Sequence, residues 1–425
     1  EYSFLVTQDG ETTEVEDPYA EGNFSFQEVD VSIETSVTPE AISYQEHAVV
    51  SIDASSSDDA EFSRGFIDLT EVGGPERVEF DVELMAHTIA VAEETSVGEK
   101  VLPVTLVDEF GNHHASEVSV EIVEREVSDG ADFDWDEARI YFMLTDRFSD
   151  GDESNNDPND VGYDTDHPES YHGGDFQGII DNLDYLDALG INTIWISPIV
   201  DNIDHNQRHG QDESQYGYHG YWAKDFTSID EHFGDLETFK TLIDEAHDRD
   251  MKIMVDVVLN HAGYGMNDAE QFDGMIRDNP VAGDDIIGEL AGLPDFRTED
   301  PAVREQVIQW QLDWITELQD FTTDNNNTID YFRVDTVKHV DNTTWNAFKN
   351  ELTKIKPDFK MIGEWYGASV NSTGGQLRSG RMDSLLDFNF KGQAERFING
   401  NITEIEAELA DRNNKIDNTA MMGQF

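Results

Sequence analysis

The stretch Tyr331-Phe-Arg-Val-Asp-Thr-Val-Lys-His339 determines, together with the tripeptide Ile362-Gly363-Glu364, which fold and chemistry the sequence predicts. Each begins as a short apolar run, which predicts a buried strand, and each places a carboxylate at the end of that run. In a parallel α/β barrel, reactive groups gather at the carboxyl ends of the strands. Arg333 lies two residues before Asp335, so the two-residue period of a strand puts both side chains on one face. A guanidinium fixed there favours the ionised form of Asp335.

Two carboxylates on neighbouring strand ends suit the cleavage of a glycosidic bond, which needs one ionised and one protonated carboxyl group. In this interpretation Asp335 is the nucleophile and Glu364 is the proton donor. An isolated Arg-x-Asp on a strand is more often a structural ion pair. The two-carboxylate hypothesis therefore depends on the rest of the chain.

The composition is strongly acidic, with 92 Asp and Glu against 26 Lys and Arg, a formal net charge of −66 on 425 residues. Such a charge repels nucleic acids and anionic membranes, so we expect neither as a partner. Hydrophobic residues still make up 38% and aromatic residues 10%. Because they fall in periodic runs, the sequence predicts folded domains with an acidic surface and not a disordered acidic chain. We expect an adaptation to high salt, which screens the charge repulsion.

The sequence contains no cysteine, which excludes disulfides, thiol nucleophiles and thiolate zinc sites. It has no run of 18 apolar residues, which a membrane-spanning helix requires. The chain opens at Glu1 with neither Met nor a signal-peptide pattern, so we expect a processed or cropped N-terminus. Our expectation for location is a secreted, extracellular protein.

The first part of the chain predicts β-structure. Short strands separated by turn clusters, such as Glu109-Phe-Gly-Asn112, are typical of an immunoglobulin-like β-sandwich, which we assign to residues 37–126. The alternating runs lie at 78–84, 101–107 and 118–123. Residues 1–36 resemble the last strands of a preceding carbohydrate-binding sandwich, since a fragment this short cannot bury its own core.

From Asp132 the pattern changes to alternating strands and helices. Predicted strands lie at 140–144, 191–196, 252–257, 330–334, 359–363, 385–388 and 419–422, and predicted helices at 176–189, 236–247, 301–318, 343–354 and 392–410. This alternation predicts the α/β class with a parallel sheet, and about seven strands in one run favour a (β/α)8 TIM barrel. We assign it to residues 132–425, with a short inserted loop domain at 262–293. Because an eighth strand is missing, we expect the barrel to be C-terminally incomplete.

Together these residues resemble the alpha-amylase superfamily, glycoside hydrolase family 13, over about residues 138–425. The stretches that carry the resemblance are Tyr218-His-Gly-Tyr-Trp222, Asp256-Val-Val-Leu-Asn-His261, Leu293-Pro-Asp-Phe296, Phe332-Arg-Val-Asp-Thr-Val-Lys-His339 and Gly363-Glu-Trp365. The resemblance implies that Asp335 forms a glycosyl-enzyme, that Glu364 acts as acid and then as base, and that Arg333 keeps Asp335 ionised.

The resemblance also implies a set of substrate-binding residues. Tyr221 would stack on a sugar ring and His261 would hydrogen-bond to sugar hydroxyls. Trp222 belongs to the same motif as Tyr221, and Lys338 and His339 resemble a pair near the leaving-group subsites. Without the motifs, a structural Tyr or His at a strand end would be the simpler interpretation.

One family signature is absent, a His-Asp pair after the seventh strand that orients sugar hydroxyls. Residues 419–425 resemble the strand that leads into this pair, and there the sequence ends. We therefore expect the chain to be a fragment of a longer protein, and no activity from a protein that ended here.

Two calcium sites follow from the resemblance. Oxygen ligands from carboxylates, amides and backbone carbonyls suit a hard cation such as Ca2+. The first site would use Asn260, Asp295 and the backbone carbonyl of His339. The second would use Asp150, Asp152, Asn155, Asn156 and Asp175, with the carbonyl of Gly173. The alternatives for the second site are an acidic loop without an ion, or sodium or magnesium at high salt.

The leading interpretation is a monomeric retaining hydrolase of α-1,4-glucosidic bonds in starch, glycogen or maltodextrin, with Ca2+ as a structural ion. The first alternative, a cyclodextrin-forming or other α-glucan transglycosylase, shares every motif, although Leu293-Pro-Asp-Phe296 looks more like the hydrolases. The second alternative is a non-catalytic glucan-binding relative. The presence of Asp335, Glu364 and Arg333 speaks against it.

Overall fold

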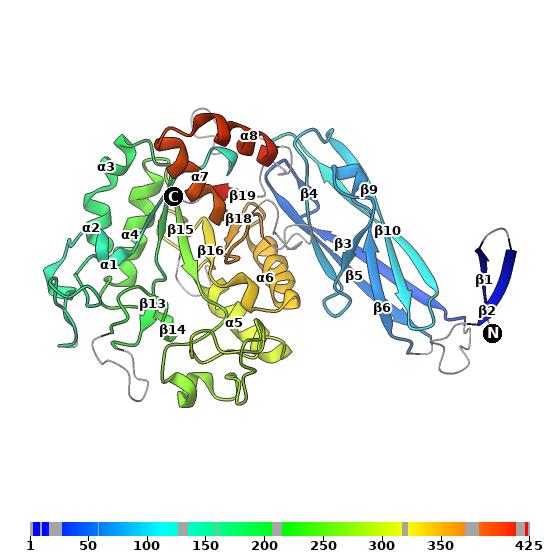
Figure 1. Ribbon diagram of the computed structural model, residues 1–425, viewed down its shortest axis with the longest axis horizontal. Coiled ribbons are helices and arrows are strands. Elements are labelled where there is room, and N and C mark those ends of the chain that lie inside the picture. Colours follow the sequence, from blue (N-terminus) through cyan, green and yellow to red (C-terminus); the bar gives the residue numbers. More distant parts are fainter. Residues whose placement is uncertain are drawn as a thin grey trace.

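The computed structural model describes residues 3–8, 11–16, 28–57, 59–125, 135–158, 160–205, 215–316, 322–369, 382–413 and 421–423. Figure 1 shows a β-sandwich built from the earlier residues beside an α/β unit built from the later ones. The first two residues of the predicted strand 419–422 and the last two of the predicted helix 301–318 lie outside the described residues. Within the described residues, no helix has the length and apolar character needed to cross a membrane.

The sandwich consists of two sheets around one core. The three-stranded sheet has the order β3 (Val31–Thr38), β5 (His47–Ser56), β8 (Ala86–Ala90). The five-stranded sheet has the order β4 (Ala41–Ile42), β10 (His113–Ile122), β9 (Gly98–Asp108), β6 (Phe62–Ile67), β7 (Val78–Phe80). Inward side chains of both sheets, such as Val50 and Leu102, share one buried cluster. A hairpin of β1 (Ser3–Gln8) and β2 (Glu11–Glu16) precedes them, and the immunoglobulin type of the sandwich stays a prediction.

One predicted strand of the sandwich is shorter than its alternating pattern indicated. The run 78–84 predicts one strand, but β7 ends at Phe80 and a turn follows. The carboxylate of Asp81 accepts a hydrogen bond from the N–H of Glu83, and the N–H of Met85 bonds to the carbonyl of Asp81. Such Asp turns compete with strand pairing, and periodicity alone does not detect them.

Seven parallel strands form the main sheet of the α/β unit, and β13 (Val200–Asn202) and β14 (Ala223–Ile229) form a separate antiparallel pair. In chain order, which is also their order in the sheet, the seven strands are β11 (Ile140–Met143), β12 (Thr193–Ile196), β15 (Lys252–Val257), β16 (Tyr331–Val334), β17 (Lys360–Gly363), β18 (Ser384–Asp387) and β19 (Met421–Gly423). Consecutive parallel strands that pair in chain order are the arrangement of a (β/α)8 barrel. The described residues therefore form a partial barrel, as the alternating pattern predicted.

Several of the helices that accompany these strands begin on aspartates. Asp235, Asp300, Asp341 and Asp387 each accept a backbone N–H of the first turn, at α4, α5, α6 and α7 respectively. The helices are α1 (Thr145–Phe148), α2 (Phe176–Asp181), α3 (Leu183–Ala188), α4 (Leu236–His247), α5 (Pro301–Asp313), α6 (Asn342–Ile355), α7 (Phe388–Ile398) and α8 (Ile402–Asn413).

Two predicted helices are each divided in two. The predicted helix 176–189 is interrupted at Asn182, whose side-chain amide donates to the carbonyl of Gly178. The predicted helix 392–410 is interrupted after Ile398 by a turn that contains Gly400, with φ 93°. The apolar stripe continues across both breaks, so hydrophobic periodicity alone predicts one helix in each case.

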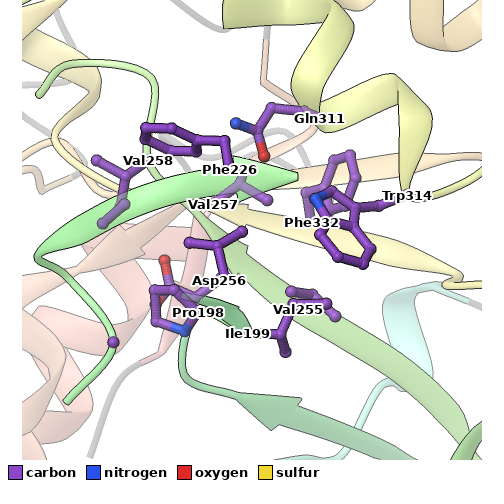
Figure 2. A pocket seen from close by; sticks show the side chains of 13 residues that line it. Pro198, Ile199, Phe226, Val255, Asp256, Val257, Val258, Gln311, Trp314 and Phe332 are labelled. Carbon is purple, nitrogen blue, oxygen red and sulfur yellow. The ribbon is translucent and has the colours of Figure 1, made fainter. Parts of the chain in front are cut away.

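Alternation along the strands separates the core into two layers. Val255 and Val257 of β15 point outward and pack with α4, α5 and α6, whereas Met254 points into the barrel. A cavity of about 10 Å³ lies on the outer side, between Val255, Val257 and the end of α5. Figure 2 shows the side chains that line it. Gln311 lines it with a side-chain N–H group that has no partner among the described residues. A volume of this size holds about one water molecule.

Helix α6 lies between the barrel and the sandwich (Figure 1). Its contacts include strands β5 and β8 of the three-stranded sheet. Thr88 of β8 donates to the side-chain oxygen of Asn350 at 2.8 Å, and Thr343 donates to Asp81 at 2.6 Å. The sandwich therefore covers the polar face of α6, which a barrel helix normally turns to solvent.

Candidate active site

Arg333 is the centre of the site. Its guanidinium lies 2.6 Å from Oδ1 of Asp335 and 3.0 Å from Oε2 of Glu364. The strand register brings the groups together, because Arg333 on β16 is paired with Ile362 on β17. One guanidinium therefore holds both predicted catalytic carboxylates at the carboxyl ends of neighbouring strands.

Asp256 is a third carboxylate on the same guanidinium. It lies on β15 in register with Arg333, and Nη1 of Arg333 donates to its two oxygens at 3.0 and 3.1 Å. The hydroxyl of Tyr221 donates to Oδ2 of Asp256 at 2.6 Å, and the indole N–H of Trp195 donates to the same oxygen at 3.2 Å. Burial raises the pKa of Asp256 against the opposing charge of Arg333. Asp256 thus fixes the orientation of Arg333 and Tyr221 from inside the barrel.

Glu364 lies in an environment that favours its protonated form. Burial raises the pKa of its carboxyl group, and Arg333 only partly offsets this effect. Its Oε2 also accepts the N–H of Thr336 at 3.3 Å. Thr336 has φ 52°, a left-handed conformation that is uncommon for a β-branched residue and that aims this N–H at Glu364.

The two carboxylates differ in a way that suits their predicted roles. The carboxylate of Asp335 has the shorter contact with Arg333, at 2.6 Å, which fixes its orientation. The side chain of Glu364 is 21% exposed, so it is reachable from solvent. A pair with one anion and one retained proton can perform acid-assisted nucleophilic substitution.

The predicted sugar-binding residues lie around this centre. The hydroxyl of Tyr221 is engaged by Asp256, which leaves the ring face as the group for stacking. Trp222 packs edge-to-face on Tyr264 and on His219, with ring centroids 5.0 and 4.4 Å apart.

His261 is placed differently from the expectation. It is 2% exposed, and its ring nitrogens lie 3.2 Å from the carbonyl of Tyr221 and 3.1 Å from the amide of Asn260. Burial lowers its pKa to about 4, so the ring is neutral near pH 7. In this structure His261 supports the backbone of Tyr221, and its two nitrogens are not free for a sugar hydroxyl.

Lys338 and His339 are held by the inserted segment. The ammonium of Lys338 lies 3.2 Å from Oδ1 of Asp285, and Nδ1 of His339 lies 2.9 Å from the carbonyl of the same residue. Both residues belong to η7 (Val337–His339), which follows the strand of Asp335 directly. The segment 281–289 therefore lies beside the edge of the site where the leaving group was predicted.

The first predicted metal site fits a cation in part. Asp295 is buried, its Oδ2 accepts Arg277 at 2.7 Å, and its Oδ1 has no partner among the described residues. Burial raises its pKa to about 7, which marks a charge that is not fully compensated. Asn260 is adjacent, since its carbonyl accepts the N–H of Phe296. The ring of His339 contacts the backbone carbonyl of Asp285. The predicted metal ligand is the backbone carbonyl of His339 and not its ring.

The second predicted metal site has two free oxygens and two carboxylates in other roles. The side-chain oxygens of Asn155 and Asn156 are buried without a partner among the described residues. The oxygen of Asn156 lies so close to Gly173 that a Cβ added to this glycine would stand 2.5 Å from it. Asp150 accepts the amide of Asn156 at 2.8 Å.

The remaining carboxylates of this second site bind backbone groups. Asp175 caps α2 through the N–H of Gly178 and also accepts the N–H groups of Gly151 and Asp152, whereas Asp152 caps η3 (Glu153–Asn155). Among the described residues, no cluster of three or more Asp, Glu, His or Cys that could hold a metal is found. The amide oxygens are therefore the part of this site that most clearly suits a cation.

Two residues of the site were not singled out from the sequence. Asp256 appeared only as the first residue of a motif, although three consecutive strands each carry a charged residue near their ends, which is a usable signal. Asp285 lies in the segment 281–289 with two other acidic residues, Asp284 and Glu289, so no pattern distinguishes it.

The sequence is similar to those of known alpha-glucan-acting proteins. Residues 142–281 match the family model described as alpha amylase, catalytic domain. The chain is 34% identical over 298 residues to a cyclomaltodextrin glucanotransferase from Klebsiella oxytoca, with coverage of 63% of this chain and 44% of the relative. It is 31% identical over 326 residues to an alpha-amylase from Streptomyces lividans, with coverage of 60% and 34%.

The fold is also similar to that of a solved alpha-amylase structure. An alpha-amylase from Anoxybacillus is 37% identical, with a TM-score of 0.52 and coverage of 62% of this chain and 55% of that one. The chain spans less than two thirds of the length of each of these relatives.

Proposed function

We propose that this chain, which carries a stretch matching the alpha-amylase catalytic domain, is the catalytic part of a glycoside hydrolase that cleaves α-1,4-glucosidic bonds with retention. The observation that carries the proposal is the single guanidinium of Arg333, which contacts both Asp335 and Glu364. The substrate would be starch, glycogen or maltodextrin, and the alpha-amylase among the relatives supports this choice.

The residues would perform two displacements. Asp335 attacks the anomeric carbon while Glu364 donates its proton to the departing oxygen, which forms a glycosyl ester on Asp335. Glu364 then removes a proton from water, which attacks the same carbon from the opposite side and releases Asp335. Arg333 stays ionised throughout, because Asp256 and Asp335 raise its pKa well above the usual range despite burial.

The test is the stereochemistry of the product. The full-length protein is incubated with maltoheptaose, and the anomeric protons of the new reducing ends are followed by NMR before mutarotation. Initial formation of the α-anomer supports retention. Initial formation of the β-anomer contradicts it, and the absence of new reducing ends contradicts the proposed function.

A transglycosylase is the second candidate. It is favoured by the 34% identity to a cyclomaltodextrin glucanotransferase. The two candidates share the first displacement and differ in whether water or a sugar hydroxyl attacks the glycosyl ester. Cyclic products from soluble starch would select the transglycosylase, and only linear products would select the hydrolase.

We also propose Ca2+ as a structural ion. Asp295 with Asn260, and Asn155 with Asn156 and Asp150, would hold it, since each group contains a buried oxygen without a partner among the described residues. The ion would supply no chemistry to the reaction and would tie loops to the barrel.

High-salt adaptation and secretion belong to the same proposal. The net charge of −66 supports a protein that folds when salt screens its surface. Refolding is compared in dilute buffer and in molar salt, and full recovery in dilute buffer would contradict the adaptation.

A further inference from the structure

A buried charged cluster joins the sandwich to the barrel. His47, the first residue of β5, lies with Nε2 3.0 Å from Oδ1 of Asp383, in a contact whose two side chains are 8% and 10% exposed. The ammonium of Lys349 on α6 donates to both oxygens of Asp383 at 3.0 and 2.8 Å. Lys360 donates to the carbonyl of Gln45 at 2.5 Å. The cluster therefore combines side chains of both folded parts.

The residues of this cluster also make several contacts with the segment 357–361. The backbone N–H of His47 donates to the carbonyl of Pro357 at 2.9 Å, and its Nδ1 lies 3.2 Å from the same oxygen. Lys349 donates to the carbonyl of Phe359 at 3.2 Å, and the N–H of Met361 donates to Asp383 at 2.7 Å. Four of the five residues in this segment therefore either contact the cluster or belong to it: Pro357, Phe359, Lys360 and Met361.

The same segment leads directly to Glu364. It forms the entry to β17 (Lys360–Gly363), and Glu364 follows that strand. Lys360, Ile362 and Glu364 occupy every second position, so their side chains lie on the same face of the strand. The side chains of Lys360 at its start and Glu364 after its end therefore share an orientation. The distance along an extended strand is about 13 Å at about 3.3 Å per residue, and the intervening residues are fully buried.

We propose that the β-sandwich is part of the catalytic unit, and that His47 is a positioning residue that fixes β17 at its entry and thereby places Glu364. This inference rests on the proposed function for its catalytic part. Removal of His47 takes away a hydrogen-bond donor from the buried Asp383 carboxylate, which disturbs the position of Asp383 and with it the backbone of Met361. Small displacements of an acid group cost much rate, about 100-fold for about 1 Å.

The first test measures the strand itself. Hydrogen exchange of the full-length protein is followed by mass spectrometry for His47→Leu and for the control His113→Leu, an exposed histidine in the same sandwich. We expect amides in 359–364 to exchange at least about tenfold faster in His47→Leu and not in the control. His47→Gln, whose amide can still donate to Asp383, should restore most of the protection. Unchanged exchange of this segment in His47→Leu overturns the proposal.

The second test measures the chemistry well below the unfolding temperature. For His47→Leu we expect kcat/KM on maltoheptaose to fall about tenfold, but kcat/KM on α-maltosyl fluoride to fall by no more than about twofold, since fluoride leaves without a proton donor. A merely structural role would lower both values equally, through the folded fraction, and that result overturns the placement of Glu364. If the wild-type protein cleaves neither substrate, the proposed function fails, and the exchange experiment alone decides whether His47 fixes β17.

Discussion

At the scale of single residues, the site is organised by one cation among several acids. Arg333 contacts Asp335, Asp256 and Glu364, and each acid has a different environment. Because burial raises the pKa of Glu364, this group keeps its proton to a higher pH than an exposed glutamate would. We therefore expect the rate to decline on the alkaline side as Glu364 ionises.

Replacement of Asp335 by Asn should abolish turnover and leave the fold intact. The amide keeps the shape of the side chain but cannot form a glycosyl ester, so we expect a loss of more than about 1,000-fold in kcat on starch. Asp278→Asn, an exposed position of the inserted segment, is the matched control and should keep full activity. One tenth of wild-type activity in Asp335→Asn would mean that the nucleophile is another residue.

Replacement of Glu364 by Gln should separate the two chemical steps. The variant lacks the proton donor, so starch should hardly react, whereas an α-glucosyl fluoride should still form the intermediate. Added azide should then speed turnover and give an α-glycosyl azide, which is detected by NMR. A β-azide, or equal loss on both substrates with no azide rescue, would assign the acid and base to a different group.

At the scale of elements, loops carry the features that the strands do not explain. The loop before α2 contains two buried amide oxygens, of Asn155 and Asn156, without partners among the described residues. Such groups are costly to bury, so they favour a bound cation at this place.

Chelation should lower the melting temperature before it affects the chemistry. An ion that binds only the folded state stabilises it by mass action, about 2.7 kcal/mol at 100 times its dissociation constant. We expect the melting temperature to rise with calcium concentration and to fall after treatment with EGTA, with Asn156→Ala less sensitive than the wild type. An unchanged melting curve after confirmed loss of metal would remove the ion from this account.

The sequence predicted the strands better than the points where helices break. The bounds of α4 (Leu236–His247) and β15 (Lys252–Val257) agree with the prediction residue by residue, because apolar periodicity and a capping Asp235 coincide there. The break at Asn182 coincides with side-chain hydrogen bonds to Gly178 and Ser149, which periodicity does not contain. In the same way, Asp335 and Glu364 were found from their strand ends, whereas the ion pair of Lys338 with Asp285 joins residues far apart in the chain.

At the scale of the whole molecule, the contact between sandwich and barrel contains titratable groups. Burial, together with Lys349 and Lys360, lowers the pKa of His47 to about 4, although Asp383 opposes the shift. Lys349 and His47 lower the pKa of Asp383 despite its burial. The neutral ring of His47 donating to the Asp383 anion is therefore the stable arrangement near pH 7.

Acid should weaken this contact in a defined range. The unfolded chain binds a proton at His47 below about pH 6.5, but the folded protein does not until about pH 4, so stability falls as pH decreases through this window. The total effect is on the order of 3 kcal/mol. Melting temperatures from pH 7 to pH 4 should decrease more steeply for the wild type than for His47→Leu. Parallel curves for the two proteins would show that His47 does not titrate in this way.

The position of α6 between sandwich and barrel has a consequence for biosynthesis. The sandwich leaves the ribosome before α6 does, and domains generally fold in that order. A completed face of β5 and β8 is then present when α6 emerges, and the helix meets its partner strands at once. Substitutions such as Thr88→Val on this face would accordingly reduce the yield of native protein during synthesis more than the activity of molecules that are already folded.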